Sequence, residues 1–184
     1  MTNKELFETY NKDVYRTCYY MLHHAADAED VCQEVFITVF RSNWQQIEYL
    51  RTWLLRVTVN HCLNHIKKSR RQREKELRHE QLSSTGTAKS AQQLLEEKET
   101  SVEWAGYLSL LPVKQRAVIS LRYVHDLGLS EIADILEIPV GTVKSRLHKG
   151  LRRMRSILEQ QGYTWKEEEG HVEQDRKSTF AAIK

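Results

Sequence analysis

The sequence has little proline and glycine, few cysteines and no long apolar run, and each shortage excludes a class of protein. Two prolines and seven glycines in 184 residues leave few helix-breaking positions, and the abundant Leu, Glu, Lys, Arg, Gln and Ala favour helix almost throughout. The three cysteines are an odd set whose spacings match no zinc pattern, so we expect buried reduced thiols at Cys18, Cys32 and Cys62.

No apolar run approaches the roughly 18 residues of a membrane-spanning helix, and the N-terminal segment is too polar for a signal peptide. We therefore expect a soluble, cytoplasmic protein without direct membrane insertion.

The formal net charge of +3 says little about partners, whereas the distribution of charge says more. Residues 1–48 carry eight acids and four bases, and residues 49–78 carry nine bases and two acids. Residues 139–158 carry six bases and no acid. Two basic segments separated by acidic ones predict two places that contact a polyanion.

Helical periodicity divides the chain into two zones, at 1–72 and 101–160, separated by a polar stretch at 73–100. The first zone predicts three or four helices, with a loop at 42–48. The polar stretch includes SSTGT, which has the composition of a flexible linker. We therefore expect an all-α fold of two small helical domains joined by a flexible linker.

Few apolar residues in the linker remain to carry a shared core, so the two domains should fold separately. The tail at 161–184 is charged and non-periodic, and we expect it to be disordered. Asp27 is the candidate N-cap of the second helix, and Ser130 is the candidate N-cap of a short helix in the second domain.

The strongest motif is a helix-turn-helix between Leu129 and Arg155, in which a short helix, a tight turn and a long basic helix follow one another. In this motif the second helix enters the major groove, where its first residues reach base edges and later ones meet phosphates. The base-reading candidates are Thr142, Lys144, Ser145, Arg146 and His148, and the phosphate candidates are Lys149, Arg152, Arg153 and Arg155. The alternative, a solvated basic face, leaves the short helix and the turn unexplained.

The stretch SLLPVKQRAVISLRYVHDLGLSEIADILEIPVGTVKSRLHKGLRRMRSIL, residues 109–158, resembles region 4 of extracytoplasmic-function (ECF, group IV) sigma factors of the sigma-70 family. The string PVGTVKSRLHKG is very close to the family pattern. Other regulators with a similar C-terminal helix-turn-helix share part of this resemblance, so region 4 alone leaves them open.

The stretch DAEDVCQEVFITVFRS, residues 27–42, resembles region 2.2 of the same family. In the family this exposed helix face binds the coiled-coil clamp helices of the polymerase β′ subunit. The matching positions here are Asp30, Gln33 and Glu34, at i, i+3 and i+4 on one face. The alternative interpretation is a plain solvated face.

The stretch YLRTWLLRVTVNHCLNHIKKSRR, residues 49–71, resembles regions 2.3 and 2.4, which capture the −10 element as an opened single strand. Reading separated bases needs stacking surfaces, polar contacts and a cationic path. The stacking candidates are Trp44, Tyr49 and Trp53, the strand contacts are Arg51, Arg56 and Asn60, and the phosphate-binding end is Lys67, Lys68, Arg70 and Arg71. One aromatic should belong to the core, with Trp53 the first candidate.

The resemblance implies a promoter-reading subunit of RNA polymerase that is not an enzyme and has no cofactor. Its implied partners are core RNA polymerase, through the β′ clamp helices and the β flap, promoter DNA, and an anti-sigma factor that holds a stress- or envelope-responsive regulator inactive.

Two alternatives remain at this point: a stand-alone helix-turn-helix regulator and a metal-dependent nucleic-acid enzyme. His61 and His65, one turn apart, are half of a zinc site. No third ligand is obvious in the sequence, so we expect no metal.

Overall fold

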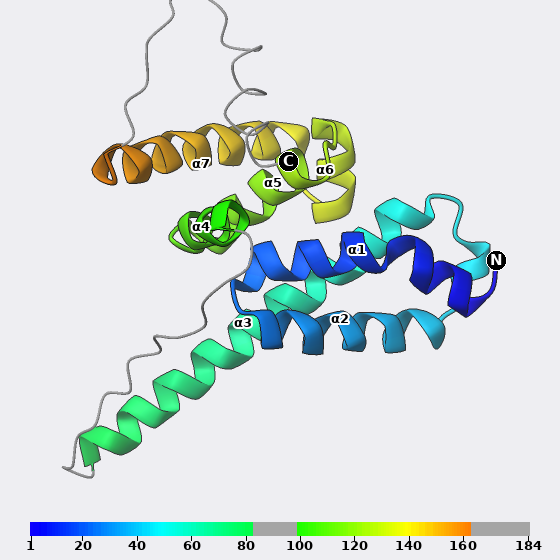
Figure 1. Ribbon diagram of the computed structural model, residues 1–184, viewed down its shortest axis with the longest axis horizontal. Coiled ribbons are helices and arrows are strands. Elements are labelled where there is room, and N and C mark those ends of the chain that lie inside the picture. Colours follow the sequence, from blue (N-terminus) through cyan, green and yellow to red (C-terminus); the bar gives the residue numbers. More distant parts are fainter. Residues whose placement is uncertain (83–98, 163–184) are drawn as a thin grey trace, which may run out of the picture.

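The computed structural model describes residues 1–82 and 99–162, and every regular element in these two ranges is a helix. The N-terminal unit consists of α1 (Asn3–Leu22), α2 (Ala25–Phe40), the 3-10 helix η1 (Trp44–Gln46) and α3 (Leu50–Leu82). The C-terminal unit consists of α4 (Glu99–Ser109), α5 (Val113–Val124), α6 (Leu129–Leu136) and α7 (Val140–Gln160). Figure 1 shows the two helical units one above the other, and the all-α prediction is confirmed.

The core of the N-terminal unit lies where α1, α2 and α3 pack together. Leu6 and Val14 of α1, Val35 of α2 and Leu54 of α3 are almost fully buried in one cluster. The three cysteines belong to the same cluster and are free and buried, as the sequence analysis expects. Burial raises the pKa of the Cys32 thiol to about 12, which makes this thiol a weak nucleophile.

Two helices begin earlier than the sequence analysis predicts. The N-cap of α2 is His24, not Asp27, and the backbone N–H of Asp27 donates to His24 Nδ1 at 3.3 Å. The N-cap of α6 is Gly128, not Ser130, and its backbone N–H donates to Glu131 Oε2 at 2.7 Å. Polar residues stabilise a helix both at the N-cap and within the first turn. The sequence alone therefore does not show which of the polar residues is the N-cap.

The helix-turn-helix is formed by α6 and α7, as the sequence analysis predicts. The buried side of α7 carries Val143, Leu147 and Met154. A Cβ atom on Gly150 would lie 2.7 Å from Ile119 Cδ1, so a larger residue at this position would force Ile119 of α5 to shift. This packing leaves the basic side of α7 facing outward.

The two units pack against each other through a shared hydrophobic cluster, which the sequence analysis does not predict, and separate folding of the two units stays a prediction. Tyr20 of α1 and Leu55 and Val59 of α3 belong to the same buried cluster as Leu121 of α5 and Ile132 of α6. In Figure 1 the C-terminal unit lies across α1 and α3. The apolar residues that carry this interface are on the helices of the units, whereas the sequence analysis looked for them in the linker.

Two arginines strengthen the interface by capping helix ends across it. Arg56 Nη2 of α3 donates to the carbonyl oxygen of Asp134 in the last turn of α6, at 2.7 Å. Arg116 Nη1 of α5 donates to the carbonyl oxygen of Met21 in the last turn of α1, at 2.5 Å. Last-turn carbonyls lack partners within their own helix and carry partial negative charge, so each unit neutralises a helix end of the other.

A buried histidine completes the interface between α1 and the turn after α5. His125 Nε2 lies 2.8 Å from Thr17 Oγ1, whose hydroxyl hydrogen is given to the carbonyl oxygen of Asp13. His125 therefore donates through Nε2, and a neutral ring carries its one proton on that nitrogen. Burial lowers the pKa of His125 to about 4, despite Asp13 Oδ1 at 3.8 Å from Nδ1, and keeps the ring neutral at physiological pH.

The boundary expected after residue 72 falls inside a helix, because α3 continues to Leu82. Residues 83–98, with most of the expected linker, and residues 163–184, with almost all of the expected tail, lie outside the described residues. Within the described ranges no helix is long and apolar enough to cross a bilayer.

Candidate nucleic-acid interface

One face of α3 collects an aromatic side chain, an amide and several cations in a single row. Trp53, Arg56, Asn60, Lys67 and Arg71 follow one another at steps of three, four, seven and four residues, which keeps them on the same side of a helix. We call these five residues the α3 face. Asn60, Lys67 and Arg71 are exposed, whereas Trp53 and Arg56 are half-buried.

The other predicted strand contacts flank this row. Tyr49 lies one residue before α3 and is 71% exposed, which suits a stacking surface. Arg51 Nε is 3.2 Å from Asp13 Oδ2, and Arg70 Nε is 2.8 Å from Glu74 Oε1. Lys68 is exposed. The structure therefore gathers most of the residues expected to bind a single strand along α3.

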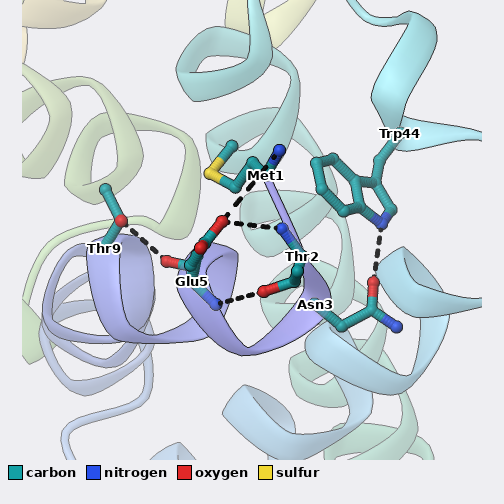
Figure 2. Close-up of polar contacts among 6 residues, drawn as sticks. All are labelled: Met1, Thr2, Asn3, Glu5, Thr9 and Trp44. Carbon is teal, nitrogen blue, oxygen red and sulfur yellow. Dashed lines mark hydrogen bonds and ion pairs between the residues drawn. The ribbon is translucent and has the colours of Figure 1, made fainter.

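Trp44 is the exception, because its side chain is only 3% exposed and belongs to the core. The core aromatic is thus Trp44, and the expectation that it is Trp53 is wrong. Figure 2 shows the indole Nε1 of Trp44 donating to Oδ1 of Asn3, at 3.0 Å. Asn3 is the first residue of α1, where Thr2 and Glu5 form a capping box. A tryptophan in a polar stretch has no sequence signal that separates a buried anchor from a stacking group.

The loop at 42–48 should therefore be held to α1 by the Trp44–Asn3 hydrogen bond. Trp44→Phe keeps an aromatic ring but removes the N–H, and Asn3→Leu removes the acceptor. Each variant should lower the free energy of unfolding. The two losses should be non-additive by about 1 kcal/mol, which is the usual net contribution of one hydrogen bond. The measurement is a double-mutant cycle by denaturant unfolding. Strict additivity would show that the hydrogen bond does not stabilise the loop.

A second exposed surface lies on α2, on the side away from the core. Asp30, Gln33 and Glu34 are all exposed there, as their spacing predicts. Ile37 follows Glu34 by three residues on the same side and is 50% exposed, although the sequence analysis does not single it out. We call these four residues the α2 face. The exposed isoleucine adds an apolar group to this otherwise polar surface, and its spacing from Asp30 is the signal that could have found it.

The two surfaces of the N-terminal unit are linked by a histidine. His61 Nδ1 of α3 lies 3.7 Å from Glu34 Oε2, and His61 Nε2 lies 3.2 Å from Thr38 Oγ1. His65 Nε2 lies 3.5 Å from Asp27 Oδ2. Each histidine thus faces a carboxylate of α2. Among the described residues, no group of three or more potential ligands is arranged for a metal ion.

The outer side of α7 carries the predicted contacts to duplex DNA. The exposed members are Lys144, Ser145, His148, Lys149, Arg152 and Arg153, whereas Thr142 and Arg146 are half-buried. No side chain caps the first turn of α7, where Pro139 is the N-cap. The first residues of the helix are open, because a Cβ atom on Gly141 would meet nothing within 4 Å. Exposed basic side chains beside the uncapped start of a helix can approach the phosphate backbone of DNA closely.

Family models match both units of the chain. The model for Sigma-70 region 2 matches residues 6–72, and the model for Sigma-70, region 4 matches residues 102–154. The curated proteins include "ECF RNA polymerase sigma factor SigW" of Bacillus subtilis, which is 34% identical over 166 residues, or 84% of this chain and 87% of that protein. They also include "ECF RNA polymerase sigma factor SigE" of Mycolicibacterium smegmatis, which is 31% identical over 84% of this chain and 60% of that protein.

Solved structures show the same fold. The sigma factor RpoE of Bartonella quintana, in complex with the anti-sigma factor NepR, superposes with a TM-score of 0.61 at 18% identity, covering 85% of this chain and 96% of that one. CnrH in complex with the cytosolic domain of CnrY superposes with a TM-score of 0.59 at 17% identity, covering 85% and 87%. At these identities the likeness establishes the fold alone.

Proposed function

We propose a division of labour between the two units of this chain, which belongs to the ECF sigma factors of the sigma-70 family. The protein is an RNA polymerase sigma factor that directs core polymerase to promoters and initiates transcription. The N-terminal unit binds core polymerase and the −10 element, and the C-terminal unit binds the −35 element. The observation that supports this most is the presence of both sigma regions in one chain, each with its own cationic surface.

The α2 face is the proposed contact with the β′ clamp helices, because three polar residues and an exposed isoleucine share it. The α3 face with Tyr49, Arg51, Lys68 and Arg70 is the proposed path of the unpaired −10 strand. Aromatic stacking and a row of cations bind separated bases and their phosphates.

The outer side of α7 is the proposed reader of the −35 duplex. Residues in its first turns, from Thr142 to His148, reach base edges, and Lys149, Arg152 and Arg153 contact phosphates further along. The β flap is the proposed polymerase contact of this unit. The place of Arg146 in the second turn of α7 supports a base-reading role, because residues near the start of this helix can reach base edges.

The remaining proposals concern the setting in which the protein acts. It is controlled by an anti-sigma factor, as the sigma factor RpoE is bound by NepR in the superposed structure. Phosphoryl transfer belongs to polymerase, so the chain contributes binding and no catalytic group. Its place of work is the cytoplasm, with the polymerase.

Transcription from mapped start sites tests the proposed function directly. Purified chain should direct core polymerase of the host to new start sites on host genomic DNA, and these sites should share a two-part upstream motif. Core polymerase alone is the control. Tight, specific binding of the free chain to duplex DNA, with no new start sites, would overturn the proposal in favour of a stand-alone regulator.

A further inference from the structure

A hollow of about 350 Å³ lies on the C-terminal unit, where α5 packs against α7 (Figure 1). We call it the α5–α7 hollow. Its volume is within the range of small-molecule sites, which begins at roughly 300 Å³. Residues of both helices line it, and none of them is acidic: Gln115, Lys149, Arg152, Arg153 and Ser156.

The three cations of the α5–α7 hollow are exposed and have no acidic partner. An ion pair within α7 joins Arg155 Nε and Glu159 Oε1 at 2.9 Å. In the part of the chain that the structure describes, no carboxylate pairs with Lys149, Arg152 or Arg153. Three unpaired positive charges around one hollow attract an anion, and the fork of an arginine matches the oxygens of a phosphate group.

Gln115 adds a polar group that the fold leaves unused. Its Oε1 atom is buried and has no hydrogen-bond partner within the described ranges. Gly150 of α7 lies close by, since a Cβ atom there would be 3.3 Å from Gln115 Cβ. A buried polar atom without a partner costs free energy, and an amide can turn either its oxygen or its NH2 group toward a ligand. The amide therefore indicates an occupant independently of the charges.

The number and spacing of the cations indicate the class of ligand. A phosphate group carries about two negative charges at neutral pH, so three cations match a diphosphate or triphosphate better than a single phosphate. The lining residues of α7 extend from Lys149 to Ser156, or about 10 Å along a helix, which leaves room for linked phosphates. Gln115 is in the first turn of α5, and this helix end adds partial positive charge.

We propose that the α5–α7 hollow binds a small ligand that carries a diphosphate or triphosphate group. Ligand binding goes beyond the proposed function and does not depend on it. The consequence of binding does rest on the proposed function, because the three cations are also the proposed phosphate contacts of the −35 duplex. A bound ligand occupies them and should weaken promoter binding.

Calorimetry on the full-length chain tests the site at constant ionic strength. The probes are inorganic phosphate, pyrophosphate and adenosine triphosphate. Pyrophosphate and adenosine triphosphate should each bind at one site per chain, at least about tenfold more tightly than phosphate, because they present more charge to the three cations. Equal affinity for all three probes, or no binding of the two larger ones, would overturn the proposal.

A carboxylate placed in the hollow should weaken binding in a position-dependent way. Gln115→Glu should lower the affinity for pyrophosphate at least about tenfold, because a like charge faces the ligand. The matched control is Gln160→Glu, the same change at the exposed last residue of α7, which does not line the hollow and should alter the affinity less than about twofold. Equal losses in the two variants would show a general attraction of anions and would overturn the site.

A second variant keeps this test decisive if circular dichroism shows that Gln115→Glu lowers the helicity of the chain. Ser156→Glu places the carboxylate on the other side of the hollow, at an exposed position. It should lower the affinity for pyrophosphate as Gln115→Glu does, and an unchanged affinity would contradict the proposal.

Promoter binding distinguishes a small ligand from a phosphate of the DNA backbone. Gln115→Leu removes the amide and should lower the affinity for pyrophosphate about fivefold. It should leave the binding of holoenzyme to a mapped promoter unchanged, because the amide oxygen is buried and out of reach of a duplex. Pyrophosphate should weaken promoter binding by the parent holoenzyme more than by the Gln115→Leu holoenzyme.

Two other outcomes are separable. Weaker promoter binding by Gln115→Leu, with no pyrophosphate binding by the parent chain, would make the hollow a DNA contact and overturn the small ligand. Failure of the proposed function would appear as absent start sites and would leave the pyrophosphate binding of the free chain intact.

Discussion

Asp30→Lys together with Glu34→Lys should abolish the co-purification of the chain with core polymerase. Both carboxylates are exposed on α2 and neither belongs to the core, so the free chain should keep its helicity. Reversing both charges of the proposed polymerase contact disrupts its charge complementarity, and each such mismatch is costly. We expect the affinity to fall at least about 100-fold, since each factor of ten corresponds to about 1.4 kcal/mol.

A matched control changes the net charge of the same unit by the same amount. Glu8→Lys with Glu76→Lys alters two exposed acids on α1 and α3, away from the α2 face, and should leave polymerase binding unchanged. Binding is measured by pull-down of core polymerase with each variant. Circular dichroism of each free variant measures its helicity. Equal binding of the Asp30/Glu34 variant and the parent chain would remove the α2 face as the main polymerase contact.

The second large effect should separate base reading from phosphate binding along α7. Arg146 lies in the second turn of α7 and is half-buried. Arg153 lies two turns further on and is exposed. A bidentate contact between arginine and guanine is worth roughly 1–3 kcal/mol of discrimination, whereas a lost phosphate contact weakens all sequences alike.

Arg146→Ala should therefore lower the preference for one or two base pairs of the −35 element about tenfold or more. Arg153→Ala should lower promoter output evenly and reduce the salt dependence of binding by about one phosphate contact. The measurement is transcription by reconstituted holoenzyme on a promoter library randomised across the −35 element. The placement of α7 in the groove is wrong if both variants keep the base preferences of the parent chain.

Much of the fold follows from patterns within single helices. The stripe of Val143, Leu147 and Met154 predicts α7, and the turn before it predicts the helix-turn-helix. Such patterns are readable because a helix brings residues three and four apart onto one side, whatever lies beyond the helix. The same argument places Asp30 and Glu34 on one exposed face before any packing is known.

The errors fall where a local pattern has two structural solutions. Asp27 suits either the cap or the first turn of α2, and the choice depends on His24, which accepts from its backbone N–H. Trp44 suits either a stacking site or a core, and the choice depends on Asn3, which is 41 residues away in the chain but accepts from the indole at 3.0 Å. In each case the deciding partner is set by packing and not by the neighbouring sequence.

The sequence by itself determined the helices, the two cationic surfaces and, through its resemblance, the family. Only the tertiary structure decided how the two units meet, because that depends on contacts between distant residues. Arg56 and Asp134 are 78 residues apart, and Arg116 and Met21 are 95 apart, so no periodic pattern connects them. The residue type at position 56 shows what its guanidinium can bind, but the helix end that this guanidinium contacts depends on the folded position of both units.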